Sequence, residues 1–298
     1  MKNLKSFLSV LKTFFIYLSF FLPIKKNPDK LYDTLSDNSG FTSKGLYLNL
    51  GLWSEKTENL DDASVALTDK LAQLGKLSPE HHLLDVGFGF AEQTLYWFKN
   101  YKPKKISGIN ICRSQVEYAS QRIKSMNLDS AIELQWGSAT QLPFQDQQFD
   151  RIFVLEAAMH FMPRHQFFKE AFRVLKPGGQ LIMADICGLT TSLNFKQRLI
   201  FNLACAFWNL DKANLYPIET YQHHLEKSGF EVTSLDSIKD NVYPPCFDFL
   251  IKKLQDNAFY QSLHPFYRFG AKQGLRFTRH YQAYPFDYVL CVAKKTIS

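Results

Sequence analysis

A strand, two closely spaced glycines and the start of a helix follow one another within residues 82–94. Asp85 stands at the tip of the strand, and Gly87 and Gly89 form a turn too tight for side chains. A strand–glycine-turn–helix unit can hold an adenosine-containing cofactor. A dinucleotide site is expected to carry a third glycine, and this chain has Glu92 there. A carboxylate would repel a pyrophosphate, whereas S-adenosylmethionine carries a sulfonium and an ammonium. The stretch therefore favours S-adenosylmethionine.

The next two strands end in residues that fit the same cofactor. Asn110, at the tip of the second strand, is expected to hydrogen-bond the ribose hydroxyls, although an amide lacks the charge-assisted strength of a carboxylate. Ile111 follows it, and Ser138 and Ala139 lie in the loop after the third strand, where the adenine is expected. The alternative for Asn110 is an ordinary turn residue.

These residues are positioned by alternating strands and helices. The expected strands are 82–86, 105–110, 132–136, 151–155 and 180–186, and the expected helices are 61–75 before them and about 91–100, 114–126 and 163–175 between them. Ser114 and Glu117 predict a capping box for the helix at 114–126. Such alternation predicts an α/β fold, a doubly wound, mostly parallel sheet of Rossmann-like type. Residues 230–235 and 288–293 add a sixth and a seventh strand.

Two helical cap insertions interrupt this pattern, at about 190–229 and 238–283. The second is rich in Tyr, Phe, Lys and Arg and is far longer than an ordinary connection. It is either a cap that buries its own aromatic side chains or an apolar acceptor channel with a basic rim. The predicted organisation is an N-terminal segment, residues 1–40, and one domain, residues 41–298.

The N-terminal segment is hydrophobic and basic. Apolar residues recur at helical spacing over residues 4–24, but Lys12 interrupts the run, and no small-residue cleavage site precedes Pro23. An interfacial helix on a membrane, a spanning anchor, or a helix packed on protein all remain open. We expect a cytoplasmic protein that associates with the membrane through this segment.

Composition narrows the partners and the compartment. The 298 residues carry a net charge of +7 and only five cysteines, none in a C-x-x-C pair. The charge allows a nucleic acid or an anionic membrane surface as partner. The cysteines indicate free thiols in a reducing compartment, and their spacing predicts no metal site.

Taken together, the chain resembles the class I S-adenosylmethionine-dependent methyltransferases. The resemblance rests on residues 84–89, 107–111, 142–144 and 173–179. A narrower likeness, carried by residues 48–53, 111–115 and 287–290, is to the branch with sugar O-methyltransferases, tocopherol methyltransferases and sterol methyltransferases. This branch implies that Gln115 helps to seat the cofactor. In its sugar methyltransferases a histidine pair follows a glutamate, and this chain has Met159-His160 after Glu156, shifted by about one residue.

Methyl transfer to a hydroxyl needs alignment and removal of a proton. We expect His160 to be the general base, because histidine titrates near neutral pH, and Asp185 to orient it, stabilise its charge or bind the acceptor. Glu156 is expected to face the methionine end of the cofactor. The alternatives are a packed helix-start residue for His160 and a strand-end turn for Asp185.

The leading hypothesis is methyl transfer to an oxygen, or secondarily a carbon, of a hydrophobic small-molecule or lipid-like acceptor. An RNA methyltransferase ranks lower, because the sequence contains no recognisable RNA-binding module. A non-catalytic cofactor-binding protein is the third hypothesis, kept because of Asn110 and Ser138.

Overall fold

The computed structural model describes residues 42, 45–189, 192–262 and 285–297. The segment 4–24, with its expected hydrophobic helix, lies outside the described residues, as do residues 263–283 of the second insertion. Among the described helices, none has both the length and the apolar character needed to cross a bilayer.

The strands form one seven-stranded sheet in the order β3-β2-β1-β4-β5-β7-β6. Their bounds are β1 His82–Val86, β2 Lys105–Asn110, β3 Ile132–Trp136, β4 Phe149–Leu155, β5 Leu175–Gly188, β6 Phe230–Ser237 and β7 Phe286–Lys295. Neighbours from β3 to β5 pair in parallel, and β7 runs antiparallel to both β5 and β6. The predicted mostly parallel sheet is therefore confirmed.

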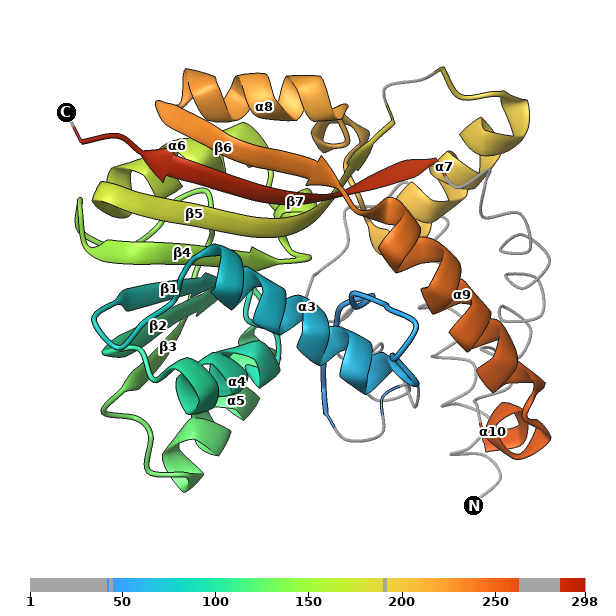
Figure 1. The fold of residues 1–298 in the computed structure, drawn as a ribbon, viewed down its shortest axis with the longest axis horizontal. Helices are drawn as coiled ribbons and strands as arrows, with labels where there is room; N and C mark the ends of the chain where they lie inside the picture. Colours follow the sequence, from blue (N-terminus) through green and yellow to red (C-terminus); the bar gives the residue numbers. More distant parts are fainter. Residues whose placement is uncertain (1–41, 43–44, 190–191, 263–284, 298) are drawn as a thin grey trace, which may run out of the picture.

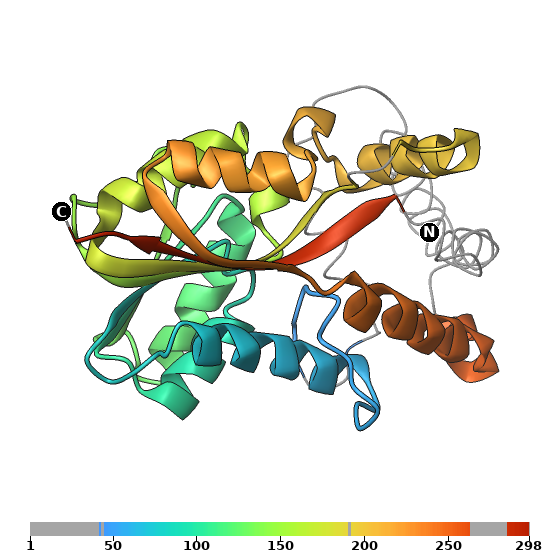
Figure 2. The same ribbon diagram turned by 45° about the horizontal axis from the view of Figure 1, so that its top comes forward.

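Helices cover both faces of the sheet, as Figures 1 and 2 show. The helices of the doubly wound core are α3 Leu60–Leu74, α4 Glu92–Tyr101 and α5 Arg113–Ser125 on one face, and α6 Arg164–Val174 and α8 Ile218–Lys227 on the other. Each face is closed by aromatic packing. Trp97 of α4 meets Phe153 of β4 at a centroid distance of 4.9 Å, and Phe168 of α6 meets Tyr221 of α8 at 5.4 Å.

The insertions place further helices beyond the carboxyl ends of the parallel strands (Figure 1). These elements are α7 Phe195–Trp208, the short helix η2 Lys212–Asn214, α9 Lys239–Gln255 and α10 Asn257–Ser262. Residues 45–53, which we call the strap, join this region to the core. The amide of Trp53 in the strap donates to the Asn241 carbonyl of α9, over 2.9 Å. The cap and the strap thus stand at the edge where α/β folds bind ligands.

Two local expectations were wrong. The cap of α5 is Cys112, in an extended conformation, and Ser114 lies inside the first turn with its Oγ 3.2 Å from the Cys112 Sγ. The capping box therefore does not form. Strand β5 begins at Leu175 rather than at Gln180, because Leu175 pairs with Phe149 of β4 across a register shift.

Candidate active site

The glycine turn after β1 is built on backbone conformations that only glycine adopts without strain. Gly87 has φ +82°, and a Cβ there would overlap the Cβ of Ala157. Gly89 has φ +56° and lies beneath Leu48 of the strap. The Gly87 amide donates to the Ile109 carbonyl of β2 over 2.8 Å, which holds the turn against the neighbouring strand. These contacts fix the turn at the carboxyl edge of the sheet.

Asp85 is completely buried at the tip of β1. Its Oδ2 accepts from the Thr94 hydroxyl over 2.6 Å, whereas no well-formed hydrogen bond reaches its Oδ1 among the described residues, although the Gln93 side chain lies near the carboxylate. Burial raises the pKa of Asp85 to about 7. A buried carboxylate oxygen without a donor is costly in a folded protein, so a cationic ligand group beside Asp85 would relieve that cost.

Glu92, at the position of the third glycine, is held by two partners of its own. Its Oε1 accepts from Arg122 Nη1 over 2.6 Å and from the Leu46 amide of the strap over 3.2 Å. The carboxylate therefore neutralises a guanidinium and fixes the strap over the start of α4. This arrangement explains how the chain dispenses with the third glycine.

Asn110 and Gln115 form one buried hydrogen-bonded pair. Asn110 Nδ2 donates to Gln115 Oε1 over 2.7 Å, and Asn110 Oδ1 accepts from the Ile111 amide over 2.9 Å. Gln115 Nε2 is buried and has no acceptor among the described residues. Beside the pair, Ile111 is 49% exposed, so its side chain is available to a flat ligand.

The loop after β3 is closed on itself. Ser138 Oγ lies 2.9 Å from Thr140 Oγ1, and Ala139 is buried. Trp136, just before this loop, holds it near the end of β2, because its Nε1 donates to the Ile111 carbonyl over 2.9 Å.

The edge thus offers a glycine turn, a buried acceptor at Asp85 and a buried donor at Gln115. These features fit S-adenosylmethionine, which has an ammonium and a polar nucleoside to satisfy them and no phosphate to meet Glu92. No cluster of metal-binding side chains occurs among the residues that the structure describes.

Glu156 follows β4 with φ +48°, a strained conformation for a residue with a side chain. Its Oε1 accepts from the Leu50 amide of the strap over 2.7 Å and from the Tyr288 hydroxyl of β7 over 2.6 Å. Burial raises the pKa of Glu156 to about 7. One carboxylate oxygen thus ties the strap to the sheet directly beside the glycine turn.

His160 ends the short helix η1, Ala158–His160, after Glu156. Burial, and then the charge of Arg164, lowers the pKa of His160 to about 4. The imidazole is therefore neutral at physiological pH, as a general base must be, but a pKa of about 4 makes it a weaker proton acceptor than an ordinary histidine.

Asp185 is fully buried and its two oxygens are already used. Oδ1 accepts from the Met159 amide over 3.0 Å. Oδ2 accepts from the Tyr221 hydroxyl over 2.9 Å and lies 3.2 Å from Nη1 of the buried Arg164. Asp185 is thus bonded to the backbone one residue before His160. Sequence reasoning missed Arg164, Asn214 and Tyr288, which hold the predicted site residues from distant elements.

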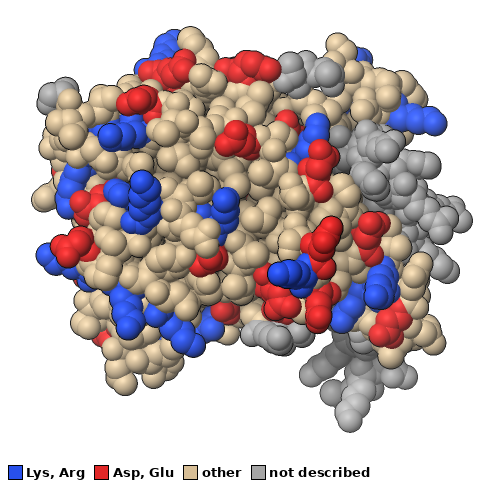
Figure 3. All heavy atoms as spheres, in the orientation of Figure 1, with Lys and Arg blue, Asp and Glu red and all other residues tan. Residues whose placement is uncertain are grey.

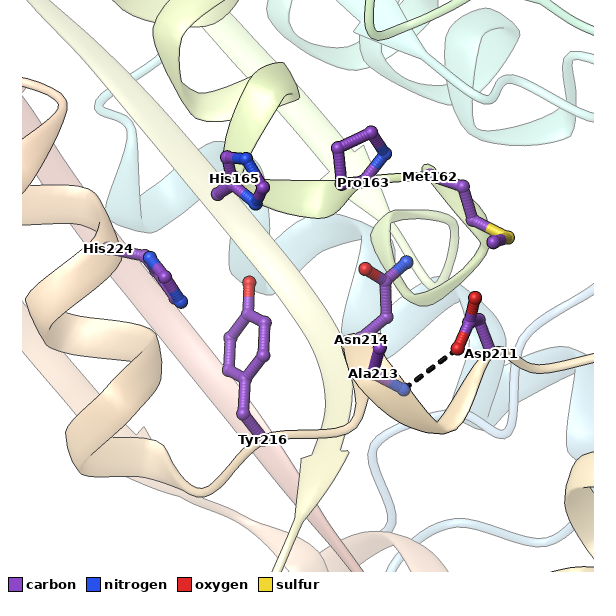
Figure 4. A pocket seen from close by; sticks show the side chains of 8 residues that line it. All are labelled: Met162, Pro163, His165, Asp211, Ala213, Asn214, Tyr216 and His224. Atoms are coloured by element: carbon purple, nitrogen blue, oxygen red, sulfur yellow. Dashed lines mark hydrogen bonds between the residues drawn. The ribbon is translucent and has the colours of Figure 1, made fainter.

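A surface hollow of about 380 Å³ lies next to residues 158–161, which we call the His160 turn. Figure 4 shows its lining: Met162, Pro163, His165, Asp211, Ala213, Asn214, Tyr216 and His224. Asn214 reaches from this wall to the turn, since its Nδ2 donates to the Phe161 carbonyl over 2.5 Å.

Comparison with known proteins gives the class. A family model described as a methyltransferase domain matches residues 84–183. Erythromycin 3''-O-methyltransferase of Saccharopolyspora erythraea is 35% identical over 248 residues, which cover 82% of this chain and 81% of that protein. The 27-O-demethylrifamycin SV methyltransferase of Amycolatopsis mediterranei is 29% identical, over 67% of this chain and 72% of that protein.

Solved structures share the fold. Cyclopropane synthase MmaA2 from Mycobacterium tuberculosis superposes with a TM-score of 0.72 at 20% identity, covering 89% of this chain and 95% of that one. The cyclase SpnF superposes with a TM-score of 0.70 at 20% identity, covering 93% and 97%.

Fold, glycine turn and relatives define an S-adenosylmethionine-dependent methyltransferase of class I. The chain belongs to this family, close to its O-methyltransferase branch. The expected enzyme class and cofactor are confirmed.

Proposed function

We propose that this enzyme methylates a hydroxyl oxygen of a polyketide-type small molecule, such as a macrolide or a sugar attached to one. The proposal draws on relatives that are named for erythromycin and rifamycin substrates and match most of the chain. The aromatic side chains Phe247 and Phe249 of α9 pack inward, Phe247 within the apolar core and Phe249 5.4 Å from the Trp53 ring of the strap, so the acceptor class rests on the relatives. On the face in Figure 3, basic and acidic side chains are interspersed, and no observation favours RNA.

The observation that carries the proposal is the placement of a neutral histidine at the same sheet edge as the glycine turn. S-adenosylmethionine supplies an electrophilic methyl group. His160, in its neutral form, accepts the proton of the acceptor hydroxyl. Asp85 binds the ammonium of the cofactor, Asn110 and Gln115 bind the ribose, and Ile111, Ser138 and Ala139 border the adenine.

The proposal is tested with methyl-labelled S-adenosylmethionine and a panel of acceptors. The panel contains 3''-O-demethylerythromycin, 27-O-demethylrifamycin SV and total RNA. We expect label in an organic extract from at least one polyketide and none in RNA. Label in RNA alone would overturn the acceptor class.

The base is tested with His160→Ala on the best acceptor of that panel. We expect a loss of about 100- to 10,000-fold in kcat with an unchanged cofactor Kd, the range typical of general base catalysis. The exposed His165 serves as the matched control, and His165→Gln should keep wild-type turnover. Near-normal turnover of His160→Ala would refute the base role.

We also propose that the chain comprises an N-terminal segment, 1–40, and a catalytic domain, 41–298, and that residues 4–24 bind the cytoplasmic membrane surface. The support is the sequence pattern of apolar residues interleaved with Lys5 and Lys12. Deletion of residues 1–40 should move the enzyme from anionic vesicles to the supernatant in a pelleting assay. Unchanged partitioning would contradict membrane binding.

A further inference from the structure

Three side chains, Arg164, Asp185 and Asn214, bond to the main chain of the His160 turn, and a fourth, Tyr221, bonds to Asp185. We call these four residues the anchoring cluster. They come from the start of α6, from β5, from η2 and from α8. All four are buried, with exposed fractions of 4% or less. Such burial of a guanidinium and a carboxylate is tolerated only when both are paired and hydrogen-bonded.

The cluster bonds to the residues on either side of His160. Arg164 Nε donates to the Ala158 carbonyl over 3.1 Å, and Asp185 Oδ1 accepts from the Met159 amide over 3.0 Å. After His160, Asn214 Nδ2 donates to the Phe161 carbonyl over 2.5 Å. The backbone of residues 158–161 is therefore fixed from both sides.

The cluster is also bonded to itself. Asn214 Oδ1 accepts from the Arg164 amide over 3.0 Å, and Tyr221 donates its hydroxyl to Asp185 over 2.9 Å. The Arg164 guanidinium lies 5.2 Å from the Tyr221 ring centroid, and its Nη2 donates to the Ile186 carbonyl over 3.1 Å. Loss of one member therefore loosens the attachment of the turn as a whole.

We propose that Arg164 and Asn214 are positioning residues that set the place and the desolvation of the His160 imidazole, acting through the main chain of residues 158–161. The inference rests on the proposed role of His160, and it assigns new functions to Arg164 and Asn214, which are not among the proposed site residues. Asn214 is the more informative of the two, because it links the first cap insertion to the His160 turn and borders the hollow of Figure 4.

The test follows the His160 ring by NMR in protein labelled with ¹³C-histidine, so that no acceptor is needed. The signal absent from His160→Ala gives the assignment. In Asn214→Asp the acceptor for the Arg164 amide remains, but an oxygen replaces the donor to Phe161. We expect the titration midpoint of His160 to rise by at least about one pH unit, toward its ordinary value, while the cofactor Kd stays within about twofold.

Controls separate positioning from folding. His165→Gln, on the same hollow, should leave the His160 midpoint unchanged. Asn214→Ala is the decisive variant, because it removes the donor to Phe161 without adding a carboxylate, whose charge alone would raise the His160 midpoint. Arg164→Lys makes the corresponding test at the second position. A wild-type His160 midpoint in folded variants of both positions would overturn the inference.

The kinetic readout keeps this inference distinct from the proposed function. Since residues acting as one unit are non-additive, Asn214→Asp should lower kcat in the wild type and have little further effect in His160→Ala. If the kcat losses of Asn214→Asp and His160→Ala were additive in the double variant, Asn214 would not act through His160, and the positioning role would be overturned. Full activity of His160→Ala with a shifted midpoint in Asn214→Asp would refute the base role but leave the positioning intact.

Discussion

Replacement of Asp85 by asparagine tests whether the buried carboxylate is the group that recognises the cofactor ammonium. The asparagine side chain keeps an acceptor for the Thr94 hydroxyl, which lies 2.6 Å from the carboxylate, and removes only the charge. A hydrogen bond to a charged group contributes about 1.5–3 kcal/mol. Asp85→Asn should therefore weaken S-adenosylmethionine binding by about 10- to 150-fold at pH 7.

The pH dependence gives a sharper signature. With a pKa of about 7, roughly half of the Asp85 carboxylates are ionised at pH 7 and about one in ten at pH 6. If only the ionised form binds the ammonium, the wild-type Kd should rise about fivefold from pH 7 to pH 6. The variant has no such ionisation, so its Kd should be flat over this range. Isothermal titration calorimetry at both pH values measures this difference.

Three comparisons make the result interpretable. Glu156 also has a pKa of about 7, and Glu156→Gln should retain the fivefold dependence. Asp129→Asn, at an exposed carboxylate, should behave as wild type. Because burial raises the pKa of Asp85, its ionisation opposes folding as pH rises through 7, so Asp85→Asn should melt no lower than wild type at pH 8. A fivefold dependence that persists in Asp85→Asn would refute the assignment.

Three further changes follow from the same contacts. Gly87→Ala places a Cβ against Ala157 at φ +82°, so it should cost at least about 1–3 kcal/mol of folding stability. The melting temperature in differential scanning fluorimetry should fall accordingly, and an unchanged melting temperature would contradict the strain argument. Burial, then Lys105, lowers the pKa of His82 to about 4, so the neutral ring stabilises the fold above pH 6.5 and this contribution is lost as pH falls through 4. The urea midpoint should accordingly drop less between pH 7 and pH 5 in His82→Gln than in wild type. Arg122→Met removes the partly exposed partner of Glu92, and it should cost no more than about 1 kcal/mol of stability in urea denaturation. The S-adenosylmethionine Kd should stay within about twofold, whereas a large loss of affinity would show that cofactor binding requires Glu92 to be neutralised.

The sheet could be predicted from the sequence because its strands are short apolar runs between clear breaks. The bounds of β1, β2 and β3 match residue for residue, and α3 begins one residue before the expected start. The errors are at contacts that a local pattern does not contain. Leu175 joins β5 because it pairs with Phe149, and Cys112 caps α5 although Ser114 has the better capping side chain.

Of the candidate site, the sequence predicts that residues of one turn lie together, but it does not reveal which distant elements contact them. Asp85, Gly87 and Gly89 lie within five residues of one another, whereas Tyr288 reaches Glu156 across 132 residues of chain. Arg164 did leave a signal. It stands at the helical spacing of the buried Phe167, Phe168 and Ala171, and a charged residue on the apolar face of a helix calls for a buried partner. Asn214, in a polar stretch of the sequence, left no such signal.

Two aspartates at the same edge illustrate what sequence position alone leaves open. Asp85 lies one residue before the end of β1, Asp185 lies inside β5 one residue beyond its last parallel pair with β4, and both have no exposed surface. Asp185 bonds Met159, Tyr221 and Arg164 within the fold, so a ligand would have to displace one of these partners to reach it. Asp85 keeps an oxygen that no well-formed hydrogen bond reaches among the described residues, although the Gln93 side chain lies near the carboxylate. Since a poorly satisfied buried oxygen gains more from a ligand than a satisfied one, we propose that Asp85 recognises the cofactor and that Asp185 supports the His160 turn.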